Sequence, residues 1–203
     1  MGPLVHVVDD DEAIRDALAW LLKSRRLACR TWASGEAFLA AFDATLRGCV
    51  VLDVRLGGMS GPECFEQMLA RGATLPVLFL TGHGDVPLAV QMLRRGAWHF
   101  VEKPCNDNEL VDLVQEALAF DARNRADQGS RANIEARLAS LTPREQEVMT
   151  RILEGKLNKQ IADALDISMR TVEVHRARVF DKMGVRSAVE LSQIVIPLRR
   201  PAP

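Results

Sequence analysis

The sequence predicts an α/β domain with a doubly wound parallel sheet, followed by a smaller all-α domain. Short apolar runs alternate with longer amphipathic segments as far as residue 120, and runs of strand type are absent from the sequence after that point. The apolar runs are continuous, which is typical of strands that helices cover on both faces. The first part therefore has the pattern of five βα units, a (βα)5 fold, and the remainder has the pattern of a four-helix domain.

The expected strands and helices alternate along the first part of the chain. The strand candidates are residues 4–8, 27–32, 49–52, 77–80 and 98–101. Apolar residues recur at spacings of three and four in segments 12–23, 35–42, 61–70, 86–94 and 106 to about 123, which predicts helices there. We therefore place the first domain at residues 1–121.

A charged segment separates the two expected domains. Residues 122–139 contain few large apolar side chains and include Gly129-Ser130, which predicts a linker that is only partly helical. The second domain, residues 140–203, opens with an N-cap at Thr142, a proline and a capping-box Glu145, and this first helix ends near Gly155. Three more helices are expected at residues 158–165, 169–183 and 187–196.

Composition narrows the class of protein. The net charge is -1, but from Leu138 onward 11 Lys and Arg face 8 Asp and Glu, giving +3 and leaving -4 for the first part. A mildly basic second domain is compatible with a polyanionic partner.

The chain has no expected targeting or membrane segment. In the start MGPLVHVVDDDE the apolar run is too short for a signal peptide, and no segment approaches the length of a membrane span. We therefore expect a cytoplasmic protein that does not enter a membrane. The four cysteines are scattered, which favours small buried hydrophobes over a zinc site or disulfides.

Polar residues stand just past the ends of four expected strands: Asp9, Asp10, Asp11, Asp53, Thr81 and Lys103. With the common strand order 2-1-3-4-5, the first and third strands are neighbours, which brings Asp9 and Asp10 against Asp53 at the ligand-binding edge of the sheet. Carboxylates crowded in this way favour a hard cation, and Mg²⁺ suits a site whose other positions are filled by water and phosphate oxygens.

This group of residues favours phosphoryl transfer to a carboxylate. Asp53 is the expected nucleophile, Lys103 the ammonium that neutralises phosphoryl oxygens, and Thr81 a hydroxyl that hydrogen-bonds the phosphate. A cis peptide bond before Pro104 would aim Lys103 at the pocket. Taken singly, the residues have other interpretations, since a strand-end Asp is often a helix cap, a Thr a turn residue and a Lys a solvated charge.

Four motifs, VVDDDE, VVLDVRLGGMSG, LTGHGD and FVEKP, resemble the receiver domain of two-component response regulators, which has a flavodoxin-like fold. The second half resembles the NarL/FixJ group, most closely its FixJ-like branch. The resemblance implies metal binding by Asp9, Asp10, Asp53 and the backbone carbonyl of Arg55, phosphorylation of Asp53, a switch hydroxyl on Thr81, a switch aromatic in Phe100 and a phosphate contact by Lys103. Gly57 stands where the family usually has proline, and we expect a more mobile loop there.

Three of these residues keep a second interpretation. An aromatic residue near the end of a buried strand, such as Phe100, is usually part of the core, and its switch role rests on the resemblance alone. Arg55 and His83 would lie at the rim of the pocket, where they could control the water that hydrolyses the acyl phosphate, or they are ordinary surface residues.

Residues 158–183 have the pattern of a helix-turn-helix. On a helical wheel of residues 169–183, Val172, Val179 and Met183 gather on one side, and small and basic residues suited to a major groove face away. The candidates for contact with bases or phosphates are Arg170, Thr171, Glu173, Val174, His175, Arg178 and Lys182. Glu173 would repel a phosphate, so it is expected to accept from a cytosine amine or to orient an arginine. The apolar stripe of the last helix either completes the core or pairs two subunits.

The resulting hypothesis is that the chain is a transcriptional activator controlled by a sensor histidine kinase. The activator would work with RNA polymerase, and the family resemblance implies that it pairs as a homodimer on promoter DNA. It would not be an enzyme, apart from slow autodephosphorylation. One alternative is an Mg²⁺-dependent phosphohydrolase of haloacid-dehalogenase type, although those enzymes carry the nucleophile on the first strand. Another is a constitutive DNA-binding protein with a purely structural first domain.

Overall fold

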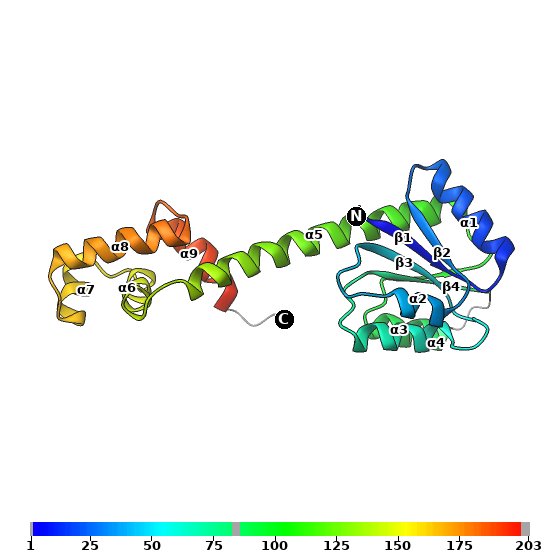
Figure 1. Ribbon diagram of the computed structural model, residues 1–203, viewed down its shortest axis with the longest axis horizontal. Helices are drawn as coiled ribbons and strands as arrows, with labels where there is room; N and C mark the ends of the chain where they lie inside the picture. The colour runs from blue at the N-terminus through cyan, green and yellow to red at the C-terminus, as the bar shows by residue number, and fades with distance from the viewer. Residues whose placement is uncertain (1, 83–85, 200–203) are drawn as a thin grey trace. The chain divides into compact units, whose positions relative to one another are not determined.

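The computed structural model describes residues 2–82 and 86–199, and the chain divides after Arg125 into two compact units. The first unit contains a five-stranded parallel sheet in the order β2-β1-β3-β4-β5 (Figure 1), which confirms the predicted order. The strands are β1 (Leu4–Val8), β2 (Cys29–Trp32), β3 (Gly48–Asp53), β4 (Val77–Thr81) and β5 (His99–Glu102). His83, expected at the pocket rim, lies outside the described residues.

Helices cover both faces of this sheet (Figure 1). They are α1 (Glu12–Ser24), α2 (Gly35–Ala41), α3 (Gly61–Ala70), α4 (Val86–Arg94) and α5 (Asp107–Ala139). Successive residues of a strand point to opposite faces. Val50 and Leu52 of β3 pack in the layer under α2, α3 and α4, whereas Cys49 and Val51 pack in the layer under α1 and α5. Burial of both faces explains why the strands have continuous apolar sequences.

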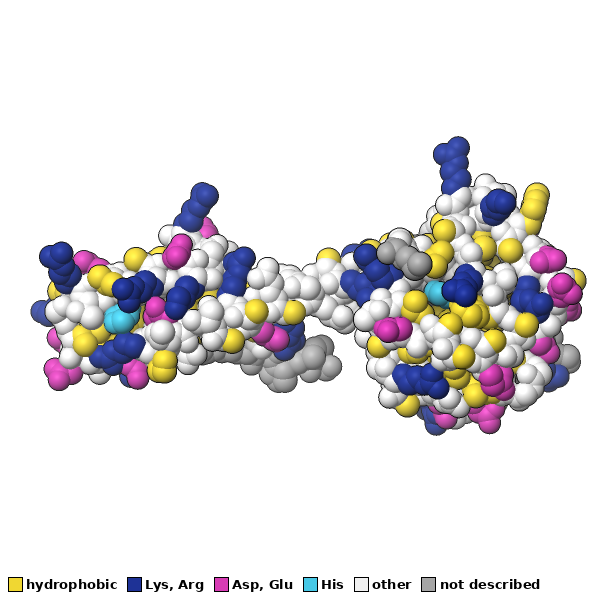
Figure 2. All heavy atoms as spheres, viewed as in Figure 1, with side chains coloured by type: hydrophobic (Ala, Val, Ile, Leu, Met, Phe, Trp, Pro, Cys, Tyr) yellow, Lys and Arg dark blue, Asp and Glu magenta, His cyan; other side chains and the backbone are white. Residues whose placement is uncertain are grey.

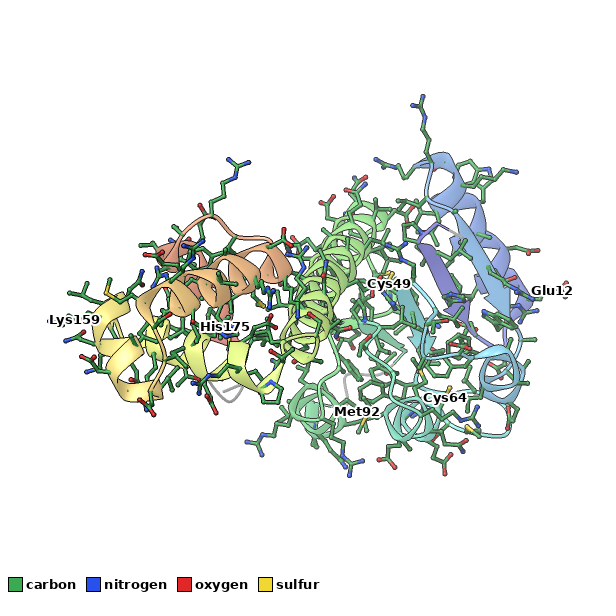
Figure 3. The ribbon with its side chains drawn as sticks, turned by 60° about the vertical axis from the view of Figure 1, so that its left-hand side comes forward. Glu12, Cys49, Cys64, Met92, Lys159 and His175 are labelled. Atoms are coloured by element: carbon green, nitrogen blue, oxygen red, sulfur yellow. The ribbon has the colours of Figure 1, made fainter. Side chains whose placement is uncertain are left out.

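The prediction that the cysteines are buried hydrophobes holds for two of the four, since Cys29 and Cys105 are only partly buried. All four are free, and Cys49 and Cys64 are fully buried inside the first unit (Figure 3). Burial raises the pKa of each of these two thiols to about 12, which keeps them protonated and unreactive.

The second unit is helical and has its own core. Its elements are α6 (Pro143–Leu153), α7 (Asn158–Leu165), α8 (Met169–Met183), α9 (Ala188–Val195) and a 3-10 turn (Pro197–Arg199). Thr142 and Glu145 form the predicted capping box at the start of α6. Apolar residues from every α-helix meet in one cluster, including Val148, Ile161, Val172, Val179 and Leu191. The turn from α7 to α8 passes through a left-handed residue, Asp166, and Ser168 then caps α8.

Helix α5 is longer than the sequence predicts. We expected it to end at about residue 123, and it continues without a break to Ala139. Good helix formers make up most of the additional turns, and an Arg131–Glu135 pair at i,i+4 supports them. Ile134 and Leu138 pack against the core of the second unit, so tertiary burial fixes the last turns. Gly129 is tolerated inside the helix because a single glycine costs only about 1 kcal/mol.

Among the described residues, no helix combines the length and the apolar character needed to cross a bilayer.

Candidate functional site

Three carboxylates meet at the carboxyl ends of β1 and β3. One oxygen from each of Asp9, Asp10 and Asp53 lies within 4.8 Å of the other two. The parallel pairing of β1 with β3 aligns Val8 with Leu52 and so places the next residues of both strands together. Asp9 is 1% exposed and Asp53 is 8% exposed, whereas Asp10 is on the surface. Two buried acids and an exposed one therefore line a single small site.

Lys103 supplies the positive charge of this site from the end of β5. Its Nζ lies 2.7 Å from Asp9 Oδ2 and 2.8 Å from Asp53 Oδ1. The peptide bond between Lys103 and Pro104 is cis, as expected from the sequence. Sheet topology brings this lysine, 50 positions beyond Asp53, to the same edge of the sheet.

Burial and the neighbouring charges have opposite effects on the pKa values of Asp53 and Lys103. Burial raises the pKa of the Asp53 carboxyl, and the hydrogen bond from Lys103 only partly offsets this. Burial acts to lower the pKa of Lys103, but its bonds to Asp53 and Asp9 outweigh burial and raise it. The lysine therefore stays charged beside the carboxylates.

Asp11 is a helix cap and not part of the acidic group. Its Oδ1 accepts from the backbone N–H groups of Ala13 and Ile14 at 2.8 and 3.4 Å, at the start of α1. Among three consecutive aspartates, the structure thus separates two site residues from one capping residue.

Arg15 is a site residue that the sequence analysis missed. Its guanidinium donates to the backbone carbonyls of Asp9 and Asp10, at 2.9 Å each. It fixes the backbone of both acids from the first turns of α1. In the sequence, Arg15 is one arginine of an amphipathic helix, and nothing in its surroundings distinguishes it from an ordinary surface arginine.

The remaining pocket residues lie where the strand order places them. Thr81 is 4% exposed at the end of β4, beside β3. Phe100 is half-buried on β5, with its ring 5.7 Å from the ring of Phe79. Arg55 is exposed, and its backbone N–H donates to Asp53 Oδ2 at 3.2 Å.

Helix α8 has the predicted division into a buried and an exposed side. Val172, Val179 and Met183 are fully buried. Lys and Arg side chains gather on the visible face of this unit (Figure 2), and Figure 3 places His175 on α8. The exposed candidates on α8 are Arg170, Glu173, Val174 and Arg178, while Thr171 and His175 are half-buried. Thr171 also shares a 2.8 Å hydrogen bond with the capping Ser168.

Lys182 has two partners inside its own domain. Its Nζ lies 2.7 Å from Glu145 Oε2 and 3.1 Å from the carbonyl of Ser140, so the contact with DNA that the sequence predicts would compete with these bonds. Glu145 is 2% exposed, so its carboxylate requires a partner inside the domain. The ammonium of Lys182 is thereby engaged in holding α8 against the start of α6.

Comparison with known families identifies the class of protein. Residues 5–115 match the response regulator receiver domain, and residues 139–195 match the luxR family of bacterial regulatory proteins. The chain belongs to the two-component response regulators that carry a receiver and a LuxR-type DNA-binding domain and regulate transcription. This class is not a classical enzyme, so the phosphohydrolase alternative is set aside.

Particular relatives match over nearly the whole chain. The C4-dicarboxylate transport transcriptional regulatory protein DctR of Rhodobacter capsulatus is 52% identical over 196 residues, which are 96% of this chain and 100% of DctR. The transcriptional regulatory protein FixJ of Azorhizobium caulinodans is 44% identical over 95% of this chain and 91% of its own. Among solved structures, the response regulator StyR is 38% identical, with a TM-score of 0.90 over 97% of this chain and 100% of StyR. Full-length FixJ from B. japonicum is 40% identical, with a TM-score of 0.61 over 97% of each chain.

Proposed function

We propose that Asp53 accepts a phosphoryl group from a sensor histidine kinase and that this modification controls DNA binding by α8. The observation that carries the proposal is the position of Lys103, whose ammonium bonds both Asp53 and Asp9 in an otherwise acidic site. The Asp53 carboxylate oxygen attacks phosphorus as the bond to the donor histidine nitrogen breaks. The proposed receiver is residues 1–121, joined by residues 122–139 to a DNA-binding domain at residues 140–203.

The acidic site fits a magnesium ion. Three carboxylates face one ammonium, which leaves a net negative charge, and hard oxygen donors are the ligands that Mg²⁺ prefers. Asp9, Asp10, Asp53 and the backbone carbonyl of Arg55 would hold it. When bound, Mg²⁺ neutralises charge on the phosphoryl oxygens.

The other pocket residues respond to the new phosphate. Lys103 exchanges its bond to Asp53 Oδ1 for one to a phosphoryl oxygen, and the Thr81 hydroxyl donates to another. Phe100, half-buried against Phe79, then changes its packing as the switch aromatic. Arg55, exposed at the pocket, controls the water that slowly removes the phosphoryl group.

On the DNA side, α8 enters the major groove with the face opposite its buried residues. The proposed contacts are Arg170, Thr171, Glu173, Val174, His175 and Arg178. Phosphorylation pairs two chains on promoter DNA, where the dimer activates transcription with RNA polymerase in the cytoplasm. Because most affinity comes from phosphate contacts, binding falls steeply with salt.

Phosphorylation is tested with acetyl phosphate and Mg²⁺, followed by intact mass. We expect one phosphoryl adduct on the wild type and none on Asp53→Asn, with Asp11→Asn as the matched control that still reacts. An adduct of equal yield on Asp53→Asn would refute the assignment.

Output is tested by electrophoretic shift with and without phosphorylation. We expect phosphorylation to favour two half-sites about one helical turn (roughly 10 bp) apart over a single half-site. Equal affinity for both duplexes in both states would refute regulated pairing.

A further inference from the structure

The loop between β3 and α3 is tied to two acidic side chains from different elements. The Gly57 N–H donates to Asp10 Oδ2 at 3.0 Å, and the Met59 N–H donates to Glu36 Oε1 at 2.8 Å. Asp10 follows β1 and Glu36 lies in the first turn of α2. We expected a more mobile loop because of Gly57, and the structure shows two hydrogen bonds that restrain it.

Position 57 does not require glycine for conformation or space. The φ angle of Gly57 lies outside the left-handed region, and among the described residues an added Cβ would meet only Asp10 Oδ2, at 3.4 Å. Gly58 is different, because its φ is +92° and an added Cβ would lie 2.8 Å from Glu36 Oε1. A proline at position 57 would have no N–H to donate. What glycine supplies there is a hydrogen-bond donor aimed at a site carboxylate.

We propose that the backbone N–H of Gly57 positions the Asp10 carboxylate for the metal ion, an inference that rests on the proposed magnesium site. Asp9 is buried and bonded by Lys103, and Asp53 is buried and bonded by Lys103 and the Arg55 N–H. Asp10 is the exposed member of the group and has the most rotamer freedom to lose when a cation binds.

The hydrogen bond leaves Asp10 able to bind a cation. A carboxylate has two oxygens with about four lone-pair sites, and one N–H occupies a single site. Gly57 therefore acts on the metal ion through Asp10, as a positioning residue.

The test compares two substitutions at position 57 in the full-length protein. Gly57→Ala keeps the N–H, whereas Gly57→Pro replaces its hydrogen with a ring carbon that pushes Asp10 away. Calorimetric titration with MgCl2 should show roughly three- to tenfold weaker binding for Gly57→Pro and binding within about twofold of the wild type for Gly57→Ala. Equal affinities in the two variants, or tighter binding by Gly57→Pro, would overturn the proposal.

A double-mutant cycle separates the hydrogen bond from stiffening of the loop by proline. Urea unfolding in EDTA should show that Gly57→Pro lowers stability in the wild type but not in Asp10→Ala, and an equal loss in both backgrounds would overturn the proposal. If Gly57→Pro does not fold, amide hydrogen exchange at Gly57 decides, because it should be faster in Asp10→Ala than in the wild type. An unchanged exchange rate would overturn the proposal.

Failure of the magnesium site itself has a different signature. Then the wild type would not bind Mg²⁺, or Asp10→Ala would bind it as tightly as the wild type. A third outcome would overturn only the role of Gly57. In it, the wild type binds Mg²⁺, Asp10→Ala binds Mg²⁺ much more weakly, and the two Gly57 variants have equal affinities for Mg²⁺.

Discussion

Replacement of Lys182 by alanine should destabilise the DNA-binding domain while leaving its sequence preference intact. The ammonium of Lys182 bonds a Glu145 carboxylate whose side chain is 3% exposed, while the lysine side chain is 34% exposed. Removing one partner of a buried pair costs roughly 3–5 kcal/mol, and an exposed pair contributes only about 0–1 kcal/mol. For this half-exposed pair we expect a loss of about 2 kcal/mol. A domain of 60–100 residues loses roughly 4–8 °C per kcal/mol, so its Tm should fall by about 8–16 °C.

The same ion pair has a pH signature. The hydrogen bond from Lys182, followed by bonds from Thr142, lowers the pKa of Glu145 from its usual 4.5 to about 2. Because the folded pKa is lower than the unfolded one, this stabilisation is complete above pH 4.5 and is lost as the pH falls toward 2. Lys182→Ala should therefore lose less stability than the wild type across this acidic window.

Thermal melts of both proteins at neutral and acidic pH measure these effects, with Lys156→Ala, an exposed lysine of the same domain, as the control. DNA binding well below the Tm should keep its salt dependence. The opposite result would be an unchanged Tm for Lys182→Ala together with a weaker salt dependence of DNA binding. A slope of log affinity against log salt that is smaller by about one would mean that Lys182 contacts a phosphate.

Three further predictions concern single side chains. Val174→Ala should reduce discrimination at one base pair by about 1 kcal/mol without changing the Tm, since Val174 is 44% exposed; shifts on matched and substituted duplexes would show it, and unchanged discrimination would exclude a base contact. Arg15→Ala should weaken Mg²⁺ binding several-fold because the carbonyls of Asp9 and Asp10 lose their shared donor, whereas Arg94→Ala, at an exposed arginine of α4, should not; equal affinities in a metal titration would contradict this. Gly129→Ala should raise the free energy of unfolding by about 0.5–1 kcal/mol, because the added Cβ meets no atom of the described residues within 4 Å; urea unfolding that shows no gain would indicate that α5 is not helical there in solution.

The architecture was predictable because local and global signals agree in this chain. Continuous apolar strands and amphipathic helices alternate in the first unit, and the strand order follows from the (βα)5 pattern. The acidic site was predictable for the same reason, since every member stands at or just past the carboxyl end of a strand, and the carboxyl ends of parallel strands lie at one edge of the sheet. The capping box at Thr142 marked the start of α6 correctly.

What the sequence did not predict depends on contacts between distant segments. Arg15 and Lys182 have ordinary sequence surroundings, and their roles come from partners that only folding brings near, the carbonyls after β1 and the carboxylate of Glu145. The length of α5 was missed because the pattern of its second half is weak. Those turns are fixed by burial of Ile134 and Leu138 against the other helices of the second unit, and propensity alone cannot show this.

Helix α5 contributes residues to two separate cores. Leu110, Val111 and Val114 pack in the receiver core, and Ile134 and Leu138 pack in the core of the DNA-binding domain. Between these ends, every side chain from residue 126 to residue 133 is exposed. The middle of α5 is therefore held by its own backbone hydrogen bonds and by the Arg131–Glu135 pair, without tertiary packing. Because tertiary packing fixes both ends of the helix, its middle turns continue from turns that are already formed, and no new nucleus is needed there.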